Sequence, residues 1–457
     1  MSGAAQAADP GTARRLRSIL GGSAGNLVEW YDWYAYSACS LYFAAAVFPP
    51  GDRTAQLLNA AAVFAVGFLV RPLGGWLFGW YADRRGRRAA LTGSVLLMGG
   101  GSLLVAVTPT YAAAGALAPA LLVAARLVQG LSVGGEYGAS ATYLSEMAGA
   151  RHRGFWSSFQ YVTLIGGQLL ALGVVLALQH LLSPAALAAW GWRVPFVIGA
   201  VAAFAVRAFR RGLDETAAFA AERATAPPAS PLASLRALRA HPRAVATVVG
   251  LTAGGTVMFY TFSTYAQKYL VNTAGLGAAA ATRASALSLA LFALAQPLVG
   301  ALSDRVGRRP VLVAFGVLGT LATVPLLSAL GRARDVPAAA ALLTAALLVT
   351  SGYTAVNAVV KAELFPTAVR ALGVGFPYAV TVALFGGTAE YLALWARRAG
   401  HEAWYGWYVT ALVAASLAVY ATMPETRDAG AMGDGAGRGG EADRSAREDA
   451  SDPQPRA

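Results

Sequence analysis

The sequence predicts an all-α integral membrane protein with twelve transmembrane helices in two pseudo-symmetric six-helix bundles. Three observations lead to this fold class: few charged residues, long uncharged runs, and one loop pattern that occurs twice. Of the 457 residues, 56% are hydrophobic and 13% are charged, whereas soluble domains contain about 25% charged residues. The composition therefore excludes an ordinary soluble enzyme of this length.

Twelve stretches are expected to span the membrane. Crossing the hydrocarbon core takes about 20 helical residues, and six runs of at least 22 residues carry no charged side chain. The first run, Ala89 to Ala125, breaks at Pro109, so it contains one helix and the start of the next. The expected spans are residues 20–48, 55–79, 89–109, 116–145, 155–181, 192–209, 244–271, 282–302, 310–330, 337–362, 372–396 and 404–423.

The arginines predict the orientation of the chain. They gather in segments that alternate spans place on one side, chiefly Arg14–Arg17, Arg84–Arg88, Arg207–Arg243 and Arg305–Arg309. Positive residues concentrate on the cytoplasmic side of membrane proteins. We therefore expect a multi-pass protein of the cell inner membrane with both termini in the cytoplasm, and we do not interpret the net charge of +13 as nucleic-acid binding.

An internal repeat divides the chain into two halves. The pattern G-x-x-x-D-R-x-G-R-R runs from Gly79 to Arg88 and again from Gly300 to Arg309. Such an internal duplication indicates two homologous halves. The expected domains are a cytoplasmic segment (1–18), an N-terminal six-helix bundle (19–209), a cytoplasmic linker (210–243), a C-terminal six-helix bundle (244–424) and a disordered cytoplasmic tail (425–457).

Residues that carry enzymatic or metal chemistry are sparse. The chain has one cysteine, Cys39, which excludes a disulfide framework, and its four histidines lack the paired spacing of a metal site. No nucleophile or nucleotide-binding motif stands in the context that its chemistry requires. We expect no metal, no cofactor and no enzymatic activity.

Several motifs resemble those of a known family. The duplicated loop, the motif from Arg126 to Gly134 and the ending Pro424-Glu425-Thr426 are similar to signatures of the major facilitator superfamily. The segment from Gly25 to Tyr34 is similar to the G-N-x-x-E-W-[FY]-D opening of its metabolite:proton symporters. The resemblance runs from about Arg15 to Tyr420, and the tail after Arg427 departs from it by being longer and more acidic.

Four further segments, residues 129–138, 159–168, 265–275 and 361–366, are similar to those of dicarboxylate carriers within this family. This closer resemblance implies a secondary transporter that takes up 2-oxoglutarate or a similar dicarboxylate together with protons, by alternating access. We expect it to act as a monomer. Another specificity within the same family stays open: citrate, shikimate, another dicarboxylate or a zwitterionic osmolyte. A carrier of zwitterions has less need of two convergent guanidinium groups. Arg71 and Arg126, at membrane depth, therefore favour a dicarboxylate.

Ionisable residues at membrane depth are costly unless they are paired or face water, and they indicate function. Asp32 lies inside the first span, and Glu29 shares its helix face because the two are three residues apart. A carboxylate that gains and loses a proton could couple transport to the proton gradient. Asp32 is the stronger candidate, although it could also be a structural partner of an arginine; for Glu29, nearer the cytoplasmic end, the structural role is favoured.

Two arginines at similar depth are candidates for substrate binding. The planar guanidinium groups of Arg71 and Arg126 could each bind one carboxylate of a dicarboxylate through paired hydrogen bonds. Arg71 is the better candidate, because Arg126 belongs to a superfamily motif and could instead organise the fourth span or the proton path.

Neutral polar residues and the lysines complete the candidate site. Tyr34, Gln168 and Tyr260 could orient a small polar ligand, although each could equally serve helix packing. The only two lysines, Lys268 and Lys361, lie near span ends, where long side chains often reach the interface. Lys268 is included as a substrate-binding candidate.

The duplicated loops are expected to act as gates. If the resemblance holds, Asp83 and Arg87 in the first loop, and Asp304 and Arg308 in the second, latch the cytoplasmic helix ends together in one conformation and release them in the other.

Overall fold

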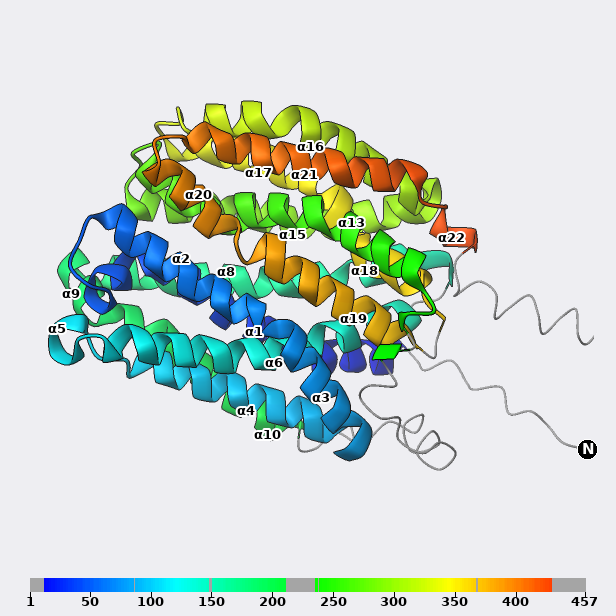
Figure 1. Ribbon diagram of the computed structural model, residues 1–457, viewed down its shortest axis with the longest axis horizontal. Coiled ribbons are helices and arrows are strands. Elements are labelled where there is room, and N and C mark those ends of the chain that lie inside the picture. The colour runs from blue at the N-terminus through cyan, green and yellow to red at the C-terminus, as the bar shows by residue number, and fades with distance from the viewer. Residues whose placement is uncertain are drawn as a thin grey trace, which may run out of the picture.

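The structure, a computed structural model, describes residues 12–85, 87–147, 150–210, 235–236, 238–366 and 369–429. Long helices cross the molecule side by side (Figure 1). The main helices before the linker are α1 (Thr12–Val47), α2 (Arg53–Leu69), α3 (Arg71–Arg85), α4 (Arg87–Ala106), α6 (Leu117–Met147), α7 (Arg153–Ser157), α8 (Phe159–Leu181) and α10 (Val194–Arg210). Short helices α5 (Tyr111–Ala114) and α9 (Pro184–Ala189) lie in connections.

The helices after the linker continue the same architecture. They are α13 (Pro242–Tyr260), η3 (Thr261–Tyr265), α14 (Ala266–Asn272), α15 (Ala278–Val306), α16 (Arg308–Leu330), α17 (Val336–Thr354), α18 (Asn357–Glu363), α19 (Arg370–Thr381), η5 (Val382–Gly386), α20 (Ala389–Arg398), α21 (Glu402–Thr422) and α22 (Thr426–Ala429). Most of the predicted linker and the tail beyond Ala429 lie outside the described residues.

Each of the twelve predicted spans coincides with a helical stretch, so the predicted fold class is confirmed. Nine stretches of the described chain are long and apolar enough to cross a membrane, and α1, α4 and α10 account for the other three spans. The first helix begins at Thr12 rather than at residue 20. It extends through the basic segment before the apolar run, because a helix can continue beyond the hydrocarbon without losing its internal hydrogen bonds.

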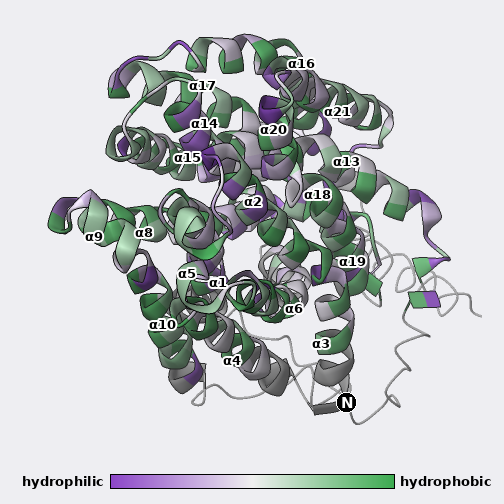
Figure 2. Cartoon of the chain, turned by 60° about the vertical axis from the view of Figure 1, so that its left-hand side comes forward, coloured by the Kyte–Doolittle hydropathy of each residue, from purple (hydrophilic) through white to green (hydrophobic). Residues whose placement is uncertain are grey.

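The outer surface of the molecule is apolar. Leu298 is 73% exposed and Leu321 is 69% exposed, and both lie in the middle of long helices. Figure 2 shows hydrophobic colouring along the outward faces of the helices. In water such a surface would promote aggregation, whereas in a bilayer it faces lipid at no cost. The protein is therefore a multi-pass membrane protein.

The helices pack in two groups that meet along a central boundary. In the first group, α1 packs on α8 and α10, and α4 packs on α6 and α10; in the second, α15 packs on α17, and α16 packs on α21 and α17. Figure 1 shows the blue-to-cyan helices below and most of the green-to-orange helices above. Contacts between the groups run mainly through α7 and α8 with α15, α6 with α19 and α2 with α20.

Several spans are interrupted rather than straight. The second span breaks between α2 and α3, where Pro72 has no amide hydrogen to donate to the preceding turn. The seventh and eleventh spans each contain one π-helical segment, η3 and η5. Interruptions of this kind leave backbone groups available to side chains and are frequent at functional sites. In this chain, they lie beside the buried polar residues described below.

Glycines allow the second and fourth spans to touch through their backbones. A Cβ atom at Gly134 would lie 1.9 Å from the carbonyl oxygen of Arg71, and one at Gly130 would lie 2.1 Å from the carbonyl oxygen of Gly67. Small residues four apart permit this close approach in membrane helices. The contact holds Arg71 at a defined height against α6, so it positions the candidate site.

We predict that Gly134→Ala lowers the thermal unfolding midpoint in detergent, because the added methyl group cannot fit without moving the α3 backbone. Overpacking of this kind costs about 1–3 kcal/mol. Gly100→Ala is the matched control, because a Cβ at Gly100 meets nothing within 4 Å. Equal midpoints for the two variants would contradict the proposed backbone contact.

Candidate functional site

Asp32 lies at the centre of a polar network inside the first group of helices. Its fully buried carboxylate accepts hydrogen bonds from the Ser102 hydroxyl on α4 and from Gln129 Nε2 on α6. The other end of the Gln129 amide accepts a hydrogen bond from Arg126 Nη1 at 2.8 Å. A Cβ at Gly199 of α10 would lie 2.7 Å from Asp32 Oδ1. Four helices thus enclose Asp32, and Gln129 connects it to Arg126.

Glu29 lies one turn away from Asp32 in a different environment. Its buried side chain accepts a hydrogen bond from the Ser132 hydroxyl at 3.5 Å. Unlike Asp32, it lines the cavity that also contains Arg71. The shared helix face expected from the sequence therefore places the two carboxylates near each other but gives them different partners.

Arg126 and Arg71 both contact the ring of Trp33. The guanidinium carbon Cζ lies 3.8 Å from the ring centroid for Arg126 and 4.2 Å for Arg71. Arg71 also lies 3.8 Å from the ring centroid of Phe68, and Arg126 lies 4.4 Å from that of Tyr36. Aromatic faces stabilise buried cations electrostatically. Trp33 is therefore a physical link between the two arginines.

The buried guanidinium groups retain unused hydrogen-bond donors. Nε and Nη2 of both Arg71 and Arg126 have no hydrogen-bond partner among the described residues. An aromatic face compensates charge but accepts only weakly from an N–H group. Each arginine therefore offers two donors that a carboxylate would satisfy.

Arg71 opens onto a cavity between the two groups of helices. The volume of the cavity that the centre of a water molecule can occupy is about 10 Å³. This is close to the space that one water molecule needs. It must widen before it can admit a metabolite, so this arrangement of the helices is closed around the site. The lining residues are Asn26, Glu29 and Trp30 of α1, Arg71 of α3, Val133, Gly134 and Tyr137 of α6, and Gly375, Tyr378 and Ala379 of α19.

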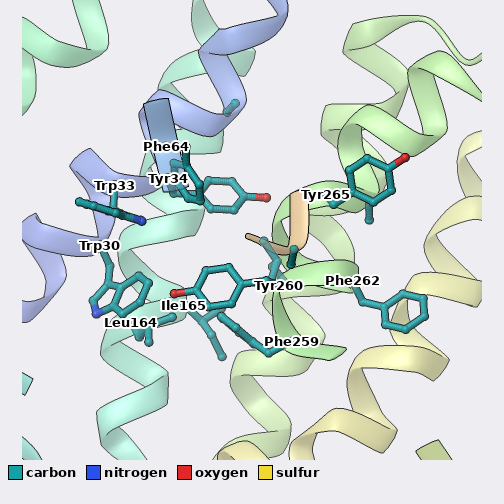
Figure 3. Packing of buried hydrophobic residues seen from close by; sticks show 14 of the residues in the cluster. Trp30, Trp33, Tyr34, Phe64, Leu164, Ile165, Phe259, Tyr260, Phe262 and Tyr265 are labelled. Carbon is teal, nitrogen blue, oxygen red and sulfur yellow. The ribbon is translucent and has the colours of Figure 1, made fainter. Parts of the chain in front are cut away.

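The three neutral candidates have different surroundings. The Tyr34 hydroxyl donates a hydrogen bond to the backbone oxygen of Ser263 in η3, so it is already engaged across the boundary between the groups. The Tyr260 hydroxyl interacts with the Arg71 guanidinium, and Gln168 Oε1 is buried without a hydrogen-bond partner among the described residues. Figure 3 shows Tyr34 pointing from α1 toward α13 and Tyr260 pointing back toward α1. Of the three, Gln168 thus has a group available to a ligand, and Tyr260 lies beside Arg71 in the candidate site.

Lys268 is engaged by a carboxylate rather than exposed to the interface. Its side chain is fully buried, and Nζ lies 3.1 Å from Glu390 Oε2 on α20. Nζ also donates to the backbone oxygen and the hydroxyl of Ser37 on α1, at 2.8 and 2.7 Å. The expected interface position is wrong, because the interrupted seventh span turns this residue inward. The cluster of Lys268, Glu390 and Ser37 joins the two groups of helices.

Lys361 is a buried cation that the sequence analysis did not place in the site. It is fully buried on α18, and Nζ donates to Asn357 Oδ1 at 2.8 Å and to the Tyr137 hydroxyl at 3.4 Å. Nζ also lies 3.8 Å from the ring centroid of Tyr378. The position near a span end suggested the interface, and this expectation is wrong. Its charge directly after the uncharged run of residues 336–360 was the available signal.

Asp304 and Arg308 form a contact between the groups at the helix ends. Arg308 Nη1 lies 2.8 Å from Asp304 Oδ1. The Asp304 carboxylate also accepts hydrogen bonds from the backbone N–H groups of Gly154 at 2.7 Å and Phe155 at 2.9 Å. Those N–H groups belong to the first turn of α7, where a negative charge is favourable. The second duplicated loop therefore binds the start of the fifth span.

Glu363 extends this contact. Its carboxylate lies 3.6 Å from both Arg308 and Arg153, and it accepts a hydrogen bond from Thr426 at 2.6 Å. The first duplicated loop contains Asp83 and Arg87, whose side chains lie outside the described residues. The backbone places them at the end of α3 and the start of α4.

The comparisons with known proteins identify the family. The family described as "Sugar (and other) transporter" matches residues 19–234 and 229–431. The chain belongs to this family. It is therefore a transporter and not an enzyme, as the motifs predicted.

Named relatives narrow the resemblance. The chain is 53% identical to the Alpha-ketoglutarate permease of Escherichia coli (strain K12), over 89% of this chain and 93% of that protein. It is 33% identical to the Citrate-proton symporter of Klebsiella pneumoniae, over 82% and 83% of the two chains. The E. coli proton:xylose symporter XylE bound to 6-bromo-6-deoxy-D-glucose has a TM-score of 0.72 at 20% identity, covering 91% and 97%. That structure confirms the major facilitator fold.

We predict that Lys268→Met lowers the thermal unfolding midpoint in detergent, because it leaves the Glu390 carboxylate buried without its counter-ion. Breaking a buried ion pair costs about 3–5 kcal/mol. The double variant Lys268→Met/Glu390→Gln removes both charges, so it should recover most of the loss. A double variant no more stable than the single one would show that the ion pair is not what Lys268 contributes.

Proposed function

We propose that this protein is a proton-coupled symporter that takes up 2-oxoglutarate or a similar dicarboxylate by alternating access. The observation that carries the proposal is Arg71, a buried guanidinium in a cavity between the two groups of helices, whose Nε and Nη2 have no hydrogen bond to the described residues. Such a group is suited to a carboxylate. The 53% identity to a protein named for alpha-ketoglutarate supports this substrate, whereas the 33% relative named for citrate supplies the main competitor.

Asp32 is proposed to carry the coupled proton. Its carboxylate binds Gln129, Gln129 binds Arg126, and Arg126 shares the Trp33 ring with Arg71. Protonation would neutralise Asp32 and change the hydrogen bonds that hold Arg126. Because Arg71 contacts the same Trp33 ring as Arg126, a movement of Arg126 would change the surroundings of Arg71. Glu29, which lines the cavity, is the second candidate.

The moving parts are proposed to be the two six-helix bundles, residues 19–209 and 244–424. At the helix ends that include Gly307, the Asp304 and Arg308 contact closes the boundary between them. At the opposite ends, Lys268 and Glu390 close it against α1. Alternating access would open one contact while the other holds.

The helix ends that include Gly307 are proposed to face the cytoplasm, so that both termini lie on the cytoplasmic side of the inner membrane. The concentration of arginines on that side supports this orientation. A single chain contains both gates and the cavity, and we propose that the monomer is the transporting unit.

We expect purified protein in proteoliposomes to accumulate labelled 2-oxoglutarate when an inward proton gradient is imposed. Unlabelled dicarboxylates should compete and betaine should not, because betaine lacks the second carboxylate. Empty liposomes and a collapsed gradient are the controls. Uptake of citrate or shikimate with none of 2-oxoglutarate would contradict the proposed substrate and keep the transporter class.

Replacing Asp32 by Asn should reduce gradient-driven accumulation by about tenfold or more, because a side-chain amide does not take up a proton near neutral pH. Exchange of labelled for unlabelled substrate across the membrane should persist, since it needs no net proton movement. Glu29→Gln is the parallel variant for the second carboxylate. Unchanged accumulation in Asp32→Asn would remove Asp32 from the coupling role.

A further inference from the structure

We propose that Lys361 binds the second carboxylate of the substrate, so that a dianion is held between Arg71 of one bundle and Lys361 of the other. This inference rests on the proposed function. It adds one residue to the proposed substrate site and specifies that the substrate is a dianion. Four observations support it: the burial of Lys361 without an anion, its contact with the cavity wall, the engagement of Arg126 elsewhere, and the separate bundles that carry the two cations.

The described neighbours of the Lys361 ammonium group are neutral. Its partners are the Asn357 amide oxygen at 2.8 Å, the Tyr137 hydroxyl at 3.4 Å and the Tyr378 ring at 3.8 Å. Among the described side chains, no carboxylate lies within 4.0 Å of Nζ, whereas the other lysine has Glu390 at 3.1 Å. A buried cation without a counter-ion costs several kcal/mol. An arriving carboxylate would offset that cost.

Two tyrosines place Lys361 directly behind the cavity that contains Arg71. Tyr137 and Tyr378 both line that cavity, and their rings stack with centroids 3.8 Å apart and planes 11° from parallel. Lys361 contacts both side chains. The stacked rings therefore separate Lys361 from the cavity, and parting them would join the two cations in one larger space.

Separation of the two rings would also explain how a substrate can enter the small cavity. The cavity has a volume of about 10 Å³ for the centre of a water molecule, which is too small for a dicarboxylate. Tyr137 lies on α6 and Tyr378 on α19, so the rings belong to opposite bundles. Movement of the bundles would thus enlarge the cavity and expose Lys361 together.

Arg126 is a weaker partner for the second carboxylate. One of its nitrogens donates to Gln129, which binds Asp32, and Arg126 does not line the described cavity. Assigning the second carboxylate to Lys361 leaves Arg126 to the proton network. A ligand held between Arg71 and Lys361 also draws the bundles together, because the two cations lie on α3 and α18.

The test compares a dianion with a monoanion of nearly the same shape. Transport of 2-oxoglutarate and of 2-oxovalerate, which lacks the distal carboxylate, is measured in proteoliposomes for the wild type, Lys361→Met and Lys361→Arg. We expect Lys361→Met to raise the KM for 2-oxoglutarate by about tenfold or more, since hydrogen bonds to charged groups are worth about 1.5–3 kcal/mol. The KM for 2-oxovalerate should stay the same. Lys361→Arg should keep a preference for the dianion.

Stabilisation by ligand gives a second readout that does not require transport. 2-Oxoglutarate should raise the thermal unfolding midpoint of the wild type and much less that of Lys361→Met. The matched control is Lys268→Met/Glu390→Gln, which removes the other buried lysine together with its partner. That variant should change the transport of both substrates in parallel and leave the ratio of their KM values unchanged.

Four outcomes would overturn the proposal. Equal losses for the dianion and the monoanion in Lys361→Met would mean that Lys361 is structural. Restoration of the 2-oxoglutarate KM by adding Glu136→Gln to Lys361→Met would mean that Lys361 neutralises Glu136, whose side chain lies outside the described residues. If the wild type transports 2-oxoglutarate and Lys361→Met leaves both KM values unchanged, the proposed role of Lys361 is wrong and the proposed function stands. If the wild type transports no dicarboxylate, the proposed function is wrong as well.

Discussion

The burial of positive charge inside a lipid-facing bundle is the constraint on which the rest of this structure depends. Arg71, Arg126, Lys268 and Lys361 are all nearly or fully buried, and none can be hydrated as it would be at a surface. Each must be compensated by neighbours, and the means of compensation differs from one to the next. Those differences separate the residues that close the protein from the residues that can receive a ligand.

Lys268 is compensated by a carboxylate, and the pair joins helices of both bundles. Arg126 is compensated by aromatic faces and by the Gln129 amide, which links it to Asp32. Arg71 and Lys361 are compensated mainly by aromatic faces and neutral groups. We propose that a full negative charge would improve the surroundings of this last pair more than those of the first two, and that anion binding and closure therefore fall to different cations.

Close backbone contacts make this arrangement possible. Gly130 and Gly134 let α6 lie directly against α2 and α3, which brings Trp33 within reach of both arginines. One ring therefore contacts Arg71, beside the cavity, and Arg126, beside the proton network. The proposed coupling between substrate and proton would then need only a small change at a shared contact, rather than a long chain of residues.

The sequence by itself determined the twelve spans, because the length of an apolar run and the charge of a loop are local properties. They decide directly whether a segment crosses the bilayer and in which direction. It also placed Asp32, Arg71 and Arg126 at membrane depth, since a charge within an apolar run is visible without a fold. Only the tertiary structure decided which partner each charge has. The pairing of Lys268 with Glu390 spans 122 residues, and Lys361 meets Tyr137 across 224. No local pattern specifies such contacts, because they depend on how the interrupted helices turn and on which faces the two bundles bring together.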